Sequence, residues 1–186
     1  DKIRNWVDYE YKDAKFAAIR QAIYSLRETK RLLTVNVYGL GAMTHPGDLA
    51  LVLQKAVTET LHKHKINIAV PTDYENYIEQ IRQNPEIWNH LIETHTALSS
   101  VVANSDQLVE SLSTGDLGIF HRVSDTLREA QLDIRLNNDN IKQWLTEIQD
   151  RLAELGTYNG LLIVWDEFTD VMTDAIGVPV LKQLQE

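Results

Sequence analysis

The sequence predicts an α/β protein in which a parallel sheet is interrupted by a large, mainly helical insertion. Two short apolar runs, at residues 32–38 and just before Asp166, have the composition of strands. Helical patterns flank both runs, and this alternation is typical of parallel sheets, because parallel strands need a crossover connection. We therefore expect residues 1–71 and 136–186 to form parts of one α/β core and residues 72–135 to be the insertion.

The first segment reads as a helix, a strand and a second helix. Apolar side chains recur at helical spacing between residues 8 and 28, and the β-branched run at 32–38 ends at the glycine-rich turn 39–41. A further helix is predicted to begin near Pro46, with an apolar stripe that extends to Leu61. Two strands are too few for an independent sheet, so we expect missing strands to lie outside these residues.

The insertion contains a succession of helix starts and no catalytic signature. Thr72 and Glu75 have the spacing of a capping box, in which each side chain accepts a hydrogen bond from the other residue's backbone. The other predicted helix starts in the insertion are Asn84-Pro85, Ser105-Asp106 and Asp116.

After the insertion, an amphipathic helix is predicted from Ile141 to Leu155, with its end at Gly156.

The segment from Tyr158 to Phe168 is the most informative part of the chain. Its apolar run predicts a buried parallel strand and ends abruptly at two adjacent carboxylates, Asp166 and Glu167. Ligands of open α/β sheets bind beyond the carboxyl ends of the strands, where both acids would emerge. One carboxylate can hold Mg²⁺, usually through its water, while the other polarises the water that attacks a γ-phosphate. The alternative is that both acids only cap the following helix.

A nucleotide hydrolase also needs a glycine-rich loop whose backbone N–H groups and Lys hold the phosphates. The sequence contains no Gly-x-x-x-x-Gly-Lys-Ser/Thr motif. The turn at Gly39 and Gly41 has no such Lys, and Thr44 stands where a dinucleotide fingerprint would have its third glycine. Nucleotide binding therefore cannot be complete within these residues.

The run ending at Asp166 and Glu167, with the helix before it, resembles the Walker B region of P-loop ATPases. It is similar to the AAA+-like or STAND-like ATPases of bacterial anti-phage systems such as BREX and RADAR. The resemblance implies an Mg²⁺-dependent ATPase, with Asp166 as the metal-associated acid, Glu167 as the catalytic base, and ATP and Mg²⁺ as cofactors. It also implies a phosphate loop upstream of Asp1, so this segment alone is expected to be inactive. The insertion would then contact partner subunits or further copies of the chain.

Composition narrows the partners and the location of the protein. The net charge is −9, with 18 basic against 27 acidic side chains, and this disfavours direct nucleic-acid binding by the segment. The chain has no cysteine, which fits a reducing compartment. Its apolar runs are too short for a membrane span. We therefore expect a cytoplasmic protein without a membrane partner.

Two rival functions remain open at this level. The first is a mainly helical protein–protein interaction module without catalytic activity, in which the two acids serve as helix caps. The second is a metal-dependent nuclease, because Asp166, Asp170 and Asp174 recur at helical spacing beside Glu167. The histidines do not have the spacing of a zinc-binding helix, and His121 has no partner that the sequence identifies.

Overall fold

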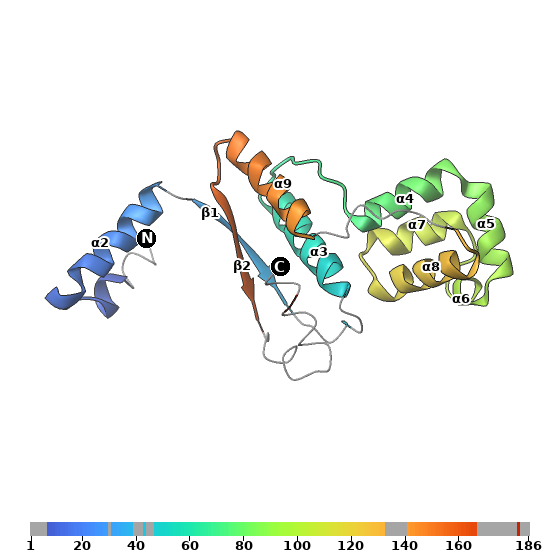
Figure 1. Ribbon diagram of the computed structural model, residues 1–186, viewed down its shortest axis with the longest axis horizontal. Coiled ribbons are helices and arrows are strands. Elements are labelled where there is room, and N and C mark those ends of the chain that lie inside the picture. Colours follow the sequence, from blue (N-terminus) through green and yellow to red (C-terminus); the bar gives the residue numbers. More distant parts are fainter. Residues whose placement is uncertain are drawn as a thin grey trace.

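The computed structural model describes residues 7–29, 31–38, 43, 47–132, 141–166 and 182. The described part is mostly helical with a small parallel sheet, in agreement with an α/β protein at this coarse level. Its elements are η1 (Ala14–Phe16), α2 (Ala17–Thr29), β1 (Leu32–Val37), α3 (Asp48–Lys63), α4 (Asp73–Gln83), α5 (Pro85–Thr94), α6 (Thr96–Ser99), α7 (Ser105–Ser113), α8 (Leu117–Glu129), α9 (Ile141–Glu154) and β2 (Gly160–Trp165). Figure 1 shows α2 at one end, the sheet with α3 and α9 in the middle, and α4–α8 at the other end.

The two strands pair in parallel, as the sequence predicts. Leu32 lies opposite Gly160 at the start of the pair, and Val37 lies opposite Trp165 at its end. A side chain fixes this register, because Asn159 accepts a hydrogen bond from the Arg31 N–H at 2.8 Å through its Oδ1. The Asn159 N–H in turn donates to the Arg31 carbonyl at 2.6 Å. The strands therefore begin and end at the same two edges of the sheet.

The sheet is buried on one face only. On the inner face, Leu33, Val35 and Val37 are each no more than 1% exposed. On the outer face, Leu162 is 46% exposed and Val164 is 45% exposed. The prediction of a buried strand before Asp166 is therefore only half right. The reason is that α3 and α9 lie along the inner face and no described element covers the outer one (Figure 1). Buried side chains of both helices share one hydrophobic cluster with Leu33 and Val35.

The helix predicted between residues 8 and 28 is wrong as a single element. A helical turn at residues 7–10 is followed by a bend, and Asp13 has an extended backbone with φ −63° and ψ 144°. An extended residue cannot continue the i→i−4 hydrogen bonds of a helix, so the chain starts again at η1 and α2. Arg20 bridges the break by donating to the carbonyl oxygens of Tyr11 and Asp13.

The helices α4 to α8, which we call the helical unit, enclose a hydrophobic core to which Leu51 of α3 also contributes. This core includes Trp88 of α5, Leu98 of α6 and Leu108 of α7, each no more than 2% exposed. The predicted capping box is confirmed at the start of α4, where Glu75 N–H donates to Thr72 Oγ1 and Thr72 N–H donates to the Glu75 carboxylate. The predicted cap of α8 is confirmed as well, because Asp116 accepts from two N–H groups of its first turn.

Candidate carboxylate edge and adjoining cavity

The carboxyl ends of β1 and β2 lie side by side at one edge of the sheet (Figure 1). Asp166 follows β2 at this edge, and its N–H donates to the Val37 carbonyl at 3.0 Å. This hydrogen bond extends the strand pairing by one step and fixes the backbone that carries the carboxylate. The Asp166 side chain is exposed to solvent. The structure thus places Asp166 where the sequence predicts an acid, at the edge beyond which α/β sheets bind ligands.

The strand end beneath Asp166 is anchored by apolar packing. Trp165 is half-buried and packs against a cluster that contains Val37 of β1, Met43 from the following loop and Leu49 of α3. Leu49 is fully buried and Met43 is 5% exposed. Because the cluster joins the ends of both strands to the start of α3, these three segments hold one another in place at the carboxylate edge.

The other predicted acids lie outside the described residues. These are Glu167, which the sequence predicts as the catalytic base, and Asp170 and Asp174, which the nuclease alternative needs. Of the predicted acids, the structure therefore places Asp166 alone.

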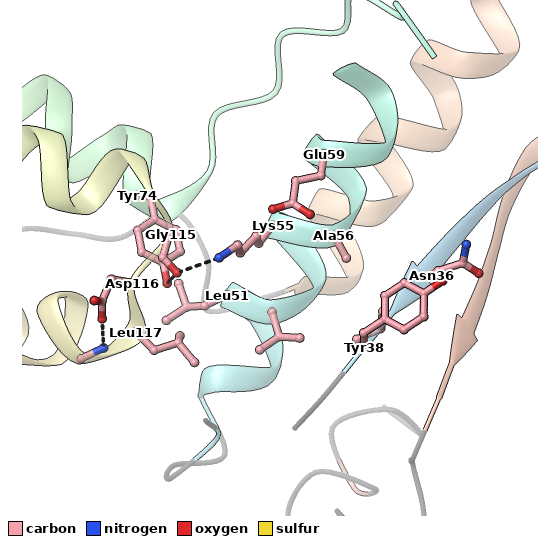
Figure 2. Close-up of a pocket in the computed structure, with 13 residues that line it drawn as sticks. Asn36, Tyr38, Leu51, Lys55, Ala56, Glu59, Tyr74, Gly115, Asp116 and Leu117 are labelled. Carbon is pink, nitrogen blue, oxygen red and sulfur yellow. Dashed lines mark hydrogen bonds between the residues drawn. The ribbon is translucent and has the colours of Figure 1, made fainter. Parts of the chain in front are cut away.

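A cavity of about 460 Å³ adjoins the end of β1 (Figure 2). Its walls are Val37 and Tyr38, one face of α3, and the junction between α7 and α8. Lys55 of α3 is the cation in this wall, and it donates to the carbonyl oxygens of Thr114 at 3.1 Å and Gly115 at 3.3 Å. The charge of Lys55 thus faces the carboxyl end of α7, where a helix dipole favours cations. Asp166 does not belong to the described lining of the cavity.

The described donor set fits Mg²⁺ only in part. Among the described residues, no three His, Asp or Glu side chains gather in a group that could hold a metal ion. Mg²⁺ keeps several waters and is commonly held by one or two carboxylates together with phosphate oxygens. Asp166 can supply one such carboxylate. The sequence contains no phosphate-loop motif beside it.

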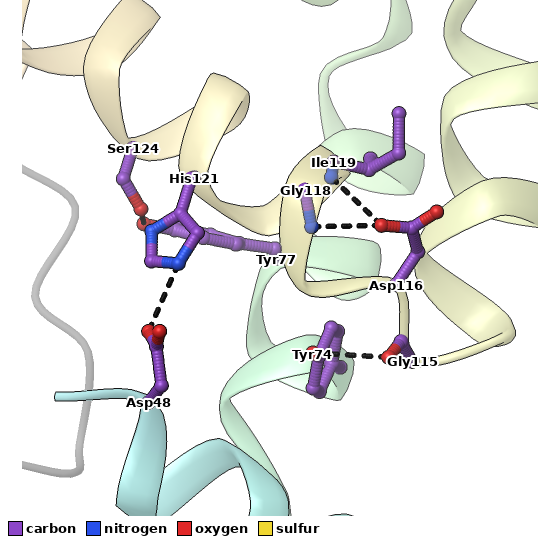
Figure 3. Close-up of polar contacts among 9 residues, drawn as sticks. All are labelled: Asp48, Tyr74, Tyr77, Gly115, Asp116, Gly118, Ile119, His121 and Ser124. Atoms are coloured by element: carbon purple, nitrogen blue, oxygen red, sulfur yellow. Dashed lines mark hydrogen bonds and ion pairs between the residues drawn. The ribbon is translucent and has the colours of Figure 1, made fainter. Parts of the chain in front are cut away.

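The structure brings together polar groups that sequence reasoning missed. His121 of α8 lies with its Nε2 2.9 Å from Oδ1 of Asp48, a carboxylate in the first turn of α3 that is 1% exposed (Figure 3). Tyr74 donates to the Gly115 carbonyl at 3.2 Å. Burial and the nearby carboxylates, first Asp116 and then Asp48, raise the pKa of Tyr74, so its hydroxyl stays protonated and remains a donor. No spacing rule could reveal these contacts, because the partners are distant in sequence.

Comparison with known proteins adds no relative to these observations. No family model, curated protein or solved structure matches the chain. Within the described residues, every helix is too short or too polar to cross a membrane. The described features define a mostly helical α/β protein that presents a carboxylate at the carboxyl edge of a parallel sheet. Its function has to be inferred from the chemistry of that edge.

Proposed function

We propose that this chain is part of an Mg²⁺-dependent ATPase whose hydrolysis cycle drives conformational change or assembly. The observation that supports this most is the position of Asp166, directly after an apolar strand and beside the end of a parallel neighbour. That edge is where α/β sheets bind ligands. The resemblance of the run 158–168 to a Walker B region supports a place in a multi-subunit bacterial defence or signalling machine.

Each acid has a separate role in this proposal. Asp166 would hold Mg²⁺, and the hydrogen bond from its N–H to the Val37 carbonyl fixes the backbone that carries this carboxylate. Glu167 accepts the proton of the water that attacks the γ-phosphate. Bound Mg²⁺ supplies charge neutralisation on the phosphate oxygens. The helical unit provides a surface for partner subunits or for further copies of the chain.

A second candidate function is a protein–protein interaction module without catalysis. The helical unit favours it, because α4–α8 supply nearly all of one hydrophobic core and account for much of the described chain. The separation of Asp166 from the cavity at the end of β1 also fits a structural role for this acid. The two functions differ in whether the protein binds and hydrolyses ATP.

The experiment that tests the proposal is ATP hydrolysis by the complete protein, with nucleotide binding measured in parallel. Glu167→Gln is expected to lower turnover by about 10²–10⁴-fold, the usual contribution of a general base, while ATP still binds. Asp166→Asn is expected to raise the Mg²⁺ concentration that half-maximal turnover requires. Glu154→Gln is the matched control, because Glu154 is an exposed acid at the end of α9.

Two results would contradict the proposal. One is equal turnover in the Glu167→Gln and Glu154→Gln variants, which would make Glu167 a structural acid. The other is a complete protein that neither binds nor hydrolyses ATP. Either result would favour the interaction module.

A further inference from the structure

Helix α3 is buried on two faces, and each face packs against a different part of the molecule. Leu49 and Leu53 lie in the cluster at the end of the sheet, and Val57 and Leu61 lie in the cluster beneath the inner sheet face. Leu51, on the opposite side of the helix, is 4% exposed and belongs to the core of the helical unit. Such a helix ties the sheet to the helical unit through apolar contacts on both sides.

Polar contacts on the same side as Leu51 bind the helical unit at several points. Gln54 is fully buried, and its Oε1 accepts a hydrogen bond from the N–H of Asp73 at the start of α4, at 3.1 Å. Lys55, next along the helix, donates to the carbonyl oxygens of Thr114 and Gly115 at the end of α7. Figure 2 shows the contact with Gly115. α3 therefore contacts a helix start and a helix end, which are the places where backbone groups lack partners within their own helix.

The pair formed by Asp48 and His121 adds a contact at the amino end of α3. Asp48 is almost fully buried, and its Oδ1 lies 2.9 Å from Nε2 of His121, across the boundary between α3 and the helical unit (Figure 3). Loss of the His121 imidazole would take one contact away from a buried carboxylate, and such a loss is costly. With Gln54 and Lys55, this pair forms a row along α3 that we call the seam.

The α7–α8 junction is shaped to fit the seam. Gly115 has a φ of +70°, a conformation that residues with a Cβ adopt with strain. A Cβ at Gly115 would lie 2.9 Å from Cδ of Lys55, so the lysine stem fills the space that the glycine leaves. The Gly115 carbonyl accepts from Tyr74 of α4 as well as from Lys55. One residue of the helical unit thus joins three helices at the boundary.

We propose that α3 carries the helical unit as a rigid arm. The amino end of α3 lies in the cluster beneath Asp166, through Leu49 and Trp165, while the seam fastens the same helix to α4, α7 and α8. A shift of α3 at the carboxylate edge then moves the whole helical unit with it. The contacts between α3 and the helical unit transmit this movement and do not absorb it. This coupling of the two parts does not depend on which function the carboxylate edge has.

The test is to measure the distance between the helical unit and α9 by pulsed electron–electron double resonance. The chain has no cysteine, so spin labels can be attached to single cysteines that replace Glu110 on α7 and Gln149 on α9, two exposed positions. The unaltered seam is expected to give one narrow distance distribution. Combining Lys55→Met with His121→Ala is expected to abolish that narrow peak and give a broad distribution.

Matched variants separate loss of the seam from loss of the fold. Lys63→Met makes the same chemical change at an exposed position of α3, and Lys55→Arg keeps a cation at the seam. Both are expected to keep the narrow peak, and circular dichroism checks that the helices persist in every variant. A narrow peak in the double variant, or a broad distribution with the seam intact, would overturn the proposal. The measurement needs no nucleotide, so its failure is distinguishable from failure of the ATPase.

Discussion

Val35→Asp is expected to destabilise the sheet by about 4 kcal/mol or more, because it places a charge in an apolar core. Val35 is fully buried on the inner face of β1, where it packs with residues of α3 and α9. Unfolding in urea, followed by circular dichroism, measures the loss, which is expected to approach the whole stability of an ordinary domain.

The neighbouring residue supplies the control. Thr34 lies on the outer face of the same strand and is exposed, so Thr34→Asp is expected to change the unfolding free energy by less than about 1 kcal/mol. Similar losses in the two variants would contradict the one-sided burial of the sheet. That result would mean that the outer face, with Leu162 and Val164, is covered in solution.

Trp88→Ala is expected to cost about 3–5 kcal/mol, the range for deleting a large aromatic side chain from a core. Trp88 is 2% exposed and lies in the core of the helical unit. Because this core is separate from the clusters around the sheet, we expect the damage to be concentrated in α4–α8. Hydrogen exchange measured by mass spectrometry should show lost protection in α5 and α7 and retained protection in β1.

The residue before Trp88 is a matched control. Ile87 is 55% exposed on the same helix, so Ile87→Ala is expected to fall within about 0.5 kcal/mol of the unaltered protein. Equal losses of unfolding free energy at the two positions would show that α5 does not bury Trp88 and expose Ile87. Loss of protection throughout β1 in the Trp88 variant would show that the helical unit and the sheet unfold together.

Local sequence signals located most of the helices correctly. Thr72 with Glu75, Pro85 and Asp116 mark real helix starts, and Gly156 follows the end of α9 with a φ of +66°. These signals work because a cap or a terminal glycine acts on backbone groups within one turn of itself. The parallel pairing also followed from the alternation of strands and helices.

Features that depend on distant residues could not be predicted in the same way. The apolar periodicity before Glu28 hides the break at Asp13, because the pattern records which side chains are apolar and not the backbone angle of one polar residue. The exposure of Leu162 depends on which face of the sheet α3 and α9 cover, and an apolar run in the sequence does not contain that information.

The candidate site was predictable in part. The sequence placed Asp166 at the carboxyl end of a parallel strand, and the structure finds it there with its N–H bound to Val37. Glu167 lies outside the described residues, and its role stays a prediction. The pair of Asp48 and His121 could not be predicted, because neither residue belongs to a motif and their contact depends on how the helical unit packs on α3.

The order of the strands in the chain has a consequence for how the protein folds. β1 and β2 are neighbours in space, yet α3, the helical unit and α9 all lie between them in sequence. Contacts over such separations form late, because the loop-closure entropy is spent before they yield any stabilisation, whereas the helices of the helical unit contact near neighbours. We expect the helical unit to form first and the strand pair last. The backbone that positions Asp166 is then among the final parts of the chain to acquire its native geometry.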